Sequence, residues 1–535
     1  MSLIRLLPLL ALTACVGDLF PGGDSPGTSP TPAPPEGLKP VPLAAELTLR
    51  RLTRVELDNS LARLTLDTNH RAFGAMPGEA LEPFDNASEK QLASAVWVEA
   101  AERVAEQIAA DIIASPSRRT ALVPCTPVGA DDPECLGRFV RQFGRRVLRR
   151  PLTEAEVTEF MSLRTLALQR GDFWTCVELV IRRLLQDPEF LFRVEVGTRG
   201  ADGVIQLDAF EVASRMSFLI QGSTPPNWLL DAAQAGTLST PVQLRAAASR
   251  LLEEPEGRAR VEVFHAMWLG YTNLPHSTAL NASMMAESTA LVRKVIFEDR
   301  ADYRTLFTAE NTWVDATLAA HYGLTGPVAG SAWIPYGTTG RKGILSHGAL
   351  LSNGVKQADT SPTLRGKWIR NRLFCEEIPP PPPDAVADVP PPASTGVVCK
   401  VDRYREHRTV ASCAGCHAQM DPIGFGLEQF DRAGKFRDRE ADHPECLITG
   451  DGALTGFGSF RGPAGLADLM ISSGVVESCL VKQLFRYTVG RKETADDSAL
   501  ITTLTTQFTE QGRRFDLLVL DLVAQPTFTQ RREAP

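Results

Sequence analysis

The chain has 535 residues, of which 43% are hydrophobic, and its 64 acidic against 56 basic side chains give a net charge of −8. This length predicts two to four domains, and the apolar content suffices to fill their cores. Basic residues alternate with acidic ones, as between Arg50 and Glu56, which is typical of a solvent-exposed helix face and argues against a nucleic-acid partner.

The first fifteen residues have the pattern of a short export signal. Arg5 precedes the apolar run Leu6–Leu12, and the small residues Thr13 and Ala14 lead to Cys15. This end resembles the lipobox of bacterial lipoproteins, which implies cleavage before Cys15 and acylation of its thiol. We therefore expect an exported lipoprotein on the periplasmic face of the outer membrane or at the cell surface, which meets the membrane through its lipid anchor only.

Helical spacing dominates the body, whereas alternating strand-like runs are scarce, so the expected fold is mainly α. Thr153 and Glu156 form the pattern of a capping box. The predicted helices include 92–113, 153–168, 173–185, 208–220, 241–252 and 261–269, followed by 403–418, which ends in a candidate site, and 475–489, which is capped by Gly490. Asp421, Pro422 and the glycines after them are expected to turn the chain away from the helix.

Changes in composition suggest where domains begin and end. The run 379–392 is rich in proline and favours a stiff, extended hinge. The predicted organisation is a signal peptide and lipobox (1–15), a disordered Pro/Gly-rich tether (16–45), three helical domains (46–120, 121–200 and 201–335), a domain that contains this hinge (336–440), a helical segment that completes a small cytochrome-c-like module (441–510), and a C-terminal helix and tail (511–535).

The most informative motif is C-x-x-C-H at Cys413, Cys416 and His417. This spacing attaches a haem covalently, because the two thiols add to the porphyrin vinyl groups and the next histidine binds the iron as proximal ligand. The expected cofactor is thus haem c. The competing interpretation is a zinc site in which Cys413 and Cys416 combine with His443 and Cys446.

Other residues could complete a haem site. Met470 is a possible distal ligand, although a methionine in an apolar helix is as easily explained by core packing. Met420 lies only three residues after His417 and is the less suitable methionine, and a distal histidine, His347 or His407, is also open. The guanidinium groups of Arg341, Arg365 and Arg437 could pair with haem propionates, or they could form ordinary structural ion pairs.

The remaining cysteines fit an oxidising compartment. Possible disulfides are Cys125 with Cys135, Cys375 with Cys399, and Cys446 with Cys479. Cys176 would remain as a buried thiol, because it lies in an apolar helical pattern.

The segment from Cys413 to Asp431 resembles the signature of a family of uncharacterised exported bacterial multidomain proteins. These are built from consecutive domains of unknown function with a C-terminal cytochrome-c-like CxxCH module. Further segments match in order: 50–56, 143–153, 185–193, 213–218, 341–345, 361–366 and 486–491. The resemblance implies fold and haem, but no substrate.

The sequence as a whole favours an exported c-type cytochrome-like lipoprotein with one covalent haem. It would act in electron transfer with an unknown redox partner protein or as part of an oxidoreductase system, and a catalytic role would need an open iron position with an acid–base group beside it. The alternative is a zinc-stapled, non-redox scaffold or binding protein.

Overall fold

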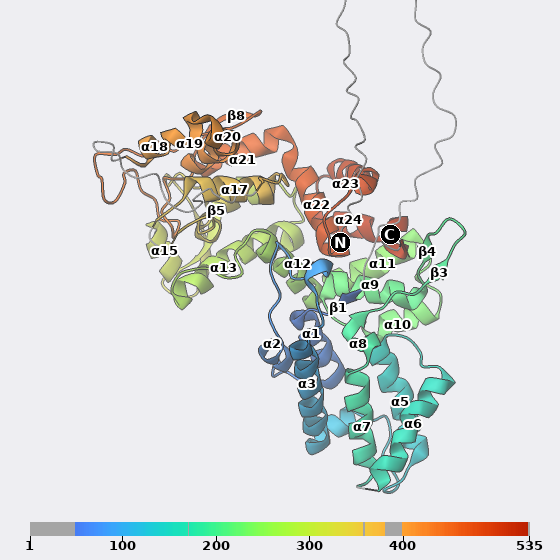
Figure 1. Cartoon of the computed structure of the whole chain (residues 1–535). Helices are drawn as coiled ribbons and strands as arrows, with labels where there is room; N and C mark the ends of the chain where they lie inside the picture. The colour runs from blue at the N-terminus through green and yellow to red at the C-terminus, as the bar shows by residue number, and fades with distance from the viewer. Residues whose placement is uncertain (1–48, 170, 357–358, 380–398, 533–535) are drawn as a thin grey trace, which may run out of the picture. The chain divides into compact units, whose positions relative to one another are not determined.

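The computed structural model describes residues 49–169, 171–356, 359–379 and 399–532 (Figure 1). The prediction of a mainly α fold is confirmed, because helices dominate and the described strands are only two to five residues long. The predicted signal peptide with Cys15, the tether and nearly all of the proline-rich hinge lie outside the described residues.

The first group of helices encloses its own hydrophobic core. Helix α7 contacts α3, α5 and α6, and buried side chains from Leu52 to Leu191, together with Phe218, fill the space between the elements. The predicted capping box at Thr153 and Glu156 is confirmed. The helices are α1 (Arg54–Thr65), α2 (Arg71–Ala75), α3 (Ala95–Ala114), α4 (Pro116–Leu122), α5 (Pro133–Leu148), α6 (Glu154–Leu168), α7 (Phe173–Leu185) and α8 (Pro188–Leu191).

A second hydrophobic core extends from Leu207 to Phe528 and includes Phe84. The segment that carries the CxxCH motif therefore shares its core with the chain on both sides. The helices before that segment are α9 (Ala209–Gln221), α10 (Asn227–Gln234), α11 (Pro241–Glu253), α12 (Pro255–Trp268), α13 (Thr278–Arg293), α14 (Thr305–Thr308), α15 (Ala316–Tyr322), α16 (Gly348–Leu351) and α17 (Pro362–Leu373). From the motif onward they are α18 (Lys400–Arg403), α19 (Arg405–Thr409), α20 (Ala411–Phe425), α21 (Gly462–Ser473), α22 (Val475–Val489), α23 (Ser498–Glu510), α24 (Phe515–Val523) and α25 (Pro526–Thr529).

Short antiparallel ladders accompany the helices, and the first and the last strand each pair with a strand that is distant in the sequence. The two longest strands place Trp313 opposite Trp333. The ladders are β1 (Arg50–Arg51) with β2 (Phe192–Arg193), β3 (Thr198–Arg199) with β4 (Ile205–Gln206) and β9 (Gln530–Arg531), β5 (Asn311–Asp315) with β6 (Ser331–Pro335), and β7 (Asp451–Leu454) with β8 (Gly458–Arg461).

The interpretation of residues 50–56 as a solvent-exposed helix face is wrong. Arg50, Arg51 and Glu56 are all buried, and the two arginines form strand β1. Arg50 Nη2 donates a hydrogen bond to the carbonyl of Thr488 in α22, and Arg260 Nη2 in α12 donates to Glu56 Oε1 at 3.0 Å. These long-range partners compensate the buried charges, and a sequence pattern cannot reveal them.

Three disulfides link the described part of the chain. The expected bond between Cys125 and Cys135 is present, but the predicted pairs Cys375–Cys399 and Cys446–Cys479 are wrong. Cys375 is bonded to Cys479, and Cys399 to Cys446. The reason is that α17, which ends just before Cys375, packs on α22. Cys176 is a buried thiol outside these bonds, as predicted.

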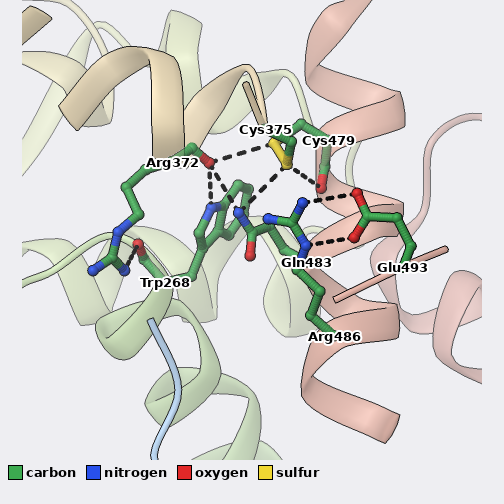
Figure 2. Close-up of a disulfide and its surroundings, with 7 residues drawn as sticks. All are labelled: Trp268, Arg372, Cys375, Cys479, Gln483, Arg486 and Glu493. Carbon is green, nitrogen blue, oxygen red and sulfur yellow. Dashed lines mark hydrogen bonds and ion pairs between the residues drawn. A yellow bond between two sulfur atoms is a disulfide. The ribbon is translucent and has the colours of Figure 1, made fainter. Parts of the chain in front are cut away.

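The Cys375–Cys479 bond lies in a polar cluster that joins three helices (Figure 2). The carbonyl of Arg372 accepts hydrogen bonds from Trp268 Nε1 at 2.6 Å and from Gln483 Nε2 at 3.4 Å. Arg486, about one turn further along α22 than Gln483, forms a bidentate ion pair with Glu493. The end of α17 is thereby tied both to α12 and to α22.

Among the described residues no single helix has the length and apolar character to cross a membrane, although α21 and α22, which meet at 84°, pass that test as a pair.

Candidate functional site

The CxxCH motif lies inside a continuous helix rather than at its end. The sequence predicts one helix over 403–418, but the structure divides this stretch among α18, α19 and α20, and α20 continues through Pro422 to Phe425. Proline has no N–H to bond the carbonyl four residues earlier, which is that of Ala418. Thr455 Oγ1 donates a hydrogen bond to this carbonyl at 3.4 Å. A long-range partner therefore compensates the defect that proline introduces.

The glycines of this region serve close helix packing. A Cβ atom on Gly424 would lie 1.9 Å from the carbonyl oxygen of Pro362, and one on Gly366 would lie 1.9 Å from that of Met420. Each glycine thus lets α17 and α20 approach to backbone contact. Helix α17 precedes the proline-rich run and α20 follows it, so the two sides of that run are packed together.

The helix places the motif side chains on one face. Residues three and four apart are neighbours on a helix surface, which brings Cys413 beside Cys416 and His417. Both cysteines are partly exposed and lie outside the three disulfides. Gly415 lies on the opposite side of the helix, where it is exposed and no atom lies within 4 Å of a Cβ built on it.

A buried carboxylate contacts the Nδ1 atom of His417. Asp421 lies one turn further along α20 and is 0% exposed, and its Oδ1 and Oδ2 atoms lie 3.1 and 3.3 Å from His417 Nδ1. Thr363 in α17 donates a hydrogen bond to Asp421 Oδ1 at 2.6 Å. Because Nδ1 is engaged, Nε2 is the ring atom of His417 that remains for a metal.

A second histidine reaches the same carboxylate. His407 Nδ1 in α19 lies 3.8 Å from Asp421 Oδ2, and the His407 ring centroid is 4.2 Å from that of His417. His407, His417 and Asp421 offer three donor atoms within 4.8 Å of one another. His407 therefore lies on the Nδ1 side of His417, which does not suit the distal position that the sequence left open for it.

The residues at this site fit a covalently attached haem. Two thiols outside the disulfides and an imidazole with its Nε2 available form the donor set that this cofactor requires. Val401 and Val410, in the same stretch of chain, are 45% and 46% exposed, and an apolar macrocycle could cover such side chains.

The other residues considered as iron ligands are explained by packing. Met470 is 0% exposed within the second hydrophobic core, so the structure supports its core interpretation and gives no support for Met470 as distal ligand. Met420 is buried as well, with its backbone against Gly366. His347 is completely buried, and its Nδ1 is 3.0 Å from Ser288 Oγ.

The three arginines considered for haem propionates have structural partners. Arg365 is 2% exposed and donates hydrogen bonds to the carbonyls of Leu351, Leu427, Phe430 and Asp431. Arg341 donates to the carbonyls of Ser346 and Gly434 and stacks on Tyr322. Arg437 pairs with Glu428 at 2.9 Å. The three arginines therefore support the alternative interpretation, in which they form structural hydrogen bonds and ion pairs rather than contacts with haem propionates.

The zinc site with Cys413, Cys416, His443 and Cys446 is also wrong. Cys446 is bonded to Cys399, and a sulfur in a disulfide has no thiolate to offer a metal. His443 Nδ1 lies 3.3 Å from the exposed Glu445 instead.

A different histidine–carboxylate cluster is enclosed in the second core. Glu287 is 0% exposed, and its carboxylate accepts hydrogen bonds from Thr312 Oγ1 and Tyr322 Oη. His347 Nε2 lies 3.7 Å from Glu287 Oε1. Burial raises the pKa of Glu287 to about 7 and lowers the pKa of His347 to about 3, so both groups are driven toward their neutral forms.

Comparison with known families divides the chain into four matched segments. In chain order they match protein families of unknown function DUF1595 (residues 135–195), DUF1592 (207–324), DUF1588 (341–440) and DUF1585 (458–528). The chain is a multidomain protein of consecutive domains of unknown function. The DUF1588 segment contains the CxxCH motif, together with α17, α19 and α20. No curated protein and no solved structure was found to be similar to this chain.

Asp421 is the site residue that sequence reasoning missed. A histidine followed four residues later by an aspartate is the signal that could have revealed it, because these positions face each other on a helix. The expectation that Pro422 ends the helix concealed this relation.

Proposed function

We propose that this chain is an exported c-type cytochrome-like protein that binds one haem through Cys413, Cys416 and His417 and transfers electrons. The observation that carries this proposal is the pair of partly exposed thiols beside His417 on one face of α20, while six other cysteines form disulfides. When bound, the haem supplies a one-electron couple between ferric and ferrous iron.

The chain's own residues would hold this group in defined ways. Cys413 and Cys416 would form the two thioether bonds, and His417 would bind the iron through Nε2. Asp421 fixes the tautomer and the ring orientation of His417 through Nδ1, because a carboxylate accepts the Nδ1 proton. Thr363 donates a hydrogen bond to the same carboxylate.

Two further observations support the compartment and the cofactor class. Disulfides persist in oxidising environments, where c-type haem is attached. The model that matches residues 341–440 carries the name PSCyt3, which is consistent with a cytochrome-like domain. We further propose that Cys15 anchors the protein to the membrane by its lipid, and that another redox protein exchanges electrons with it.

The test is a haem stain and a pyridine haemochrome spectrum on protein exported from a host with cytochrome c maturation machinery. We expect a covalent c-type signal in the wild type that is lost in Cys416→Ser. Cys176→Ala is the matched control, because it removes a buried thiol far from the motif in sequence and should keep the signal.

One experimental outcome would contradict the cytochrome proposal. If the wild type carries no covalent haem but binds stoichiometric zinc or iron, and if His407→Ala abolishes that binding, the cluster of His407, His417 and Asp421 is a mononuclear metal site and the cytochrome proposal is wrong.

A further inference from the structure

The carboxylate beneath His417 has few partners for a completely buried charge. Asp421 is 0% exposed, and in the described part of the chain its ion-pair partners are His407 and His417, with Thr363 as a neutral donor. Of the two imidazoles, His417 is much the closer, at 3.1 Å against 3.8 Å. The charge of Asp421 is therefore directed mainly at the Nδ1–H group of His417.

The packing keeps this arrangement in place. Asp421 lies next to Met420, whose backbone touches Gly366 in α17, and Thr363 approaches from the first turn of α17. Helix α17 is itself fixed at its other end by the Cys375–Cys479 disulfide. The carboxylate, its hydroxyl donor and the motif histidine are thus carried on two helices in backbone contact.

We propose that Asp421 is a positioning residue that lowers the reduction potential of the haem bound by His417. A hydrogen bond from Nδ1–H to a carboxylate increases the electron density of the imidazole, and a more basic ligand stabilises ferric over ferrous iron. The inference rests on the proposed function and deepens it, because it names the residue that tunes the potential of the proposed haem.

The experiment is a redox titration of the exported holoprotein, with covalent haem measured in parallel by the pyridine haemochrome. Asp421→Asn keeps the shape but removes the charge, and we expect the ferric-to-ferrous equilibrium to shift at least tenfold toward ferrous iron, a rise of about 59 mV. Asp402→Asn is the matched control: it removes one acid near the motif that pairs with Arg405 rather than with His417. The control should shift the equilibrium far less.

A second variant keeps the test decisive if Asp421→Asn does not fold. Thr363→Val removes the hydroxyl that competes for the Asp421 charge, so the potential should move the other way, downward. The inference is overturned if a loaded Asp421→Asn variant titrates like the Asp402→Asn control, or if the potential of Thr363→Val does not fall. Absence of covalent haem in the wild type would instead refute the proposed function itself.

Discussion

Two clusters in this molecule combine histidine with a buried carboxylate, and they differ in what remains open. At the motif, Asp421 binds Nδ1 of His417, whose side chain is 24% exposed and keeps Nε2 for a ligand. In the core, Glu287 and His347 are both 0% exposed and surrounded by protein donors. Similar residue types thus give a candidate site in one place and a structural network in the other, because exposure decides whether a ligand can reach the imidazole.

The largest effect is expected for Arg365, which holds the chain just beyond the motif helix. Arg365→Leu leaves four buried backbone carbonyls without their donor, and we expect a loss of about 3 to 5 kcal/mol in the free energy of unfolding. Urea unfolding measures it. The exposed Arg439, which donates to the carbonyl of Pro444, is the control, and Arg439→Leu should change stability by less than about 1 kcal/mol. A similar loss in both variants would contradict the structural role.

The next effect is expected for the disulfide that encloses the motif. Cys399 and Cys446 close a loop of 47 residues, and opening it in the double serine variant should cost about 4 kcal/mol by loop entropy. The double variant of Cys125 and Cys135, which close a loop of only 10 residues, should lose less, about 2.7 kcal/mol. Thermal or urea unfolding would decide, and the reverse order would show that strain or packing outweighs loop closure.

The core cluster predicts a distinct pH dependence. The folded protein holds the pKa of Glu287 at about 7, above its ordinary value of 4.5, so the folded state binds the extra proton between these values. Protonated Glu287 stabilises the folded state in full below pH 4.5. This stabilisation is lost as the pH rises through 7, by up to about 3 kcal/mol. Arg341, His347 and Tyr322 face the carboxylate and remain in place in Glu287→Gln.

Glu287→Gln should therefore gain stability relative to wild type as the pH rises from 4.5 to 8, as followed by urea unfolding at a series of pH values. Glu298→Gln, an exposed acid that lies shortly after Glu287 in sequence, should leave the wild-type profile intact. An unchanged profile in Glu287→Gln would mean that another group carries the dependence.

The smallest effect is expected for His407, which shares Asp421 with His417 only at 3.8 Å. His407→Ala should keep covalent haem, lower stability by about 1 kcal/mol or less, and shift the redox equilibrium less than Asp421→Asn does. Loss of covalent haem, or a larger redox shift than in Asp421→Asn, would show that His407 and not Asp421 controls the motif histidine.

Local signals were sufficient to predict several of the longer helices. The stretch 173–185 and the Gly490 cap of α22 were predicted as found, because apolar spacing and a left-handed glycine are properties of nearby residues. The Cys125–Cys135 bond could be predicted for the same reason, since it joins positions 10 residues apart.

Long-range partners explain what the sequence did not reveal. Thr455 donates to the Ala418 carbonyl that Pro422 cannot bond, Thr488 accepts from Arg50, and Cys479 lies 104 residues from Cys375. At the candidate site the motif identified the thiols and His417, but Asp421 and Thr363 meet His417 only because α20 continues and α17 packs against it. A sequence pattern connects residues that are near in sequence, whereas these relations depend on tertiary contact.

The separation of the cysteines into two groups has a consequence for the order of maturation. Cys413 and Cys416 are three residues apart, whereas the bonded cysteines are separated by 10, 47 and 104 residues. Short loops close most readily, so in an oxidising compartment the two motif thiols are the pair most exposed to premature oxidation. A chain that is to receive haem there must have this pair kept reduced while the other bonds form, which makes the timing of a thiol reductant part of its biosynthesis.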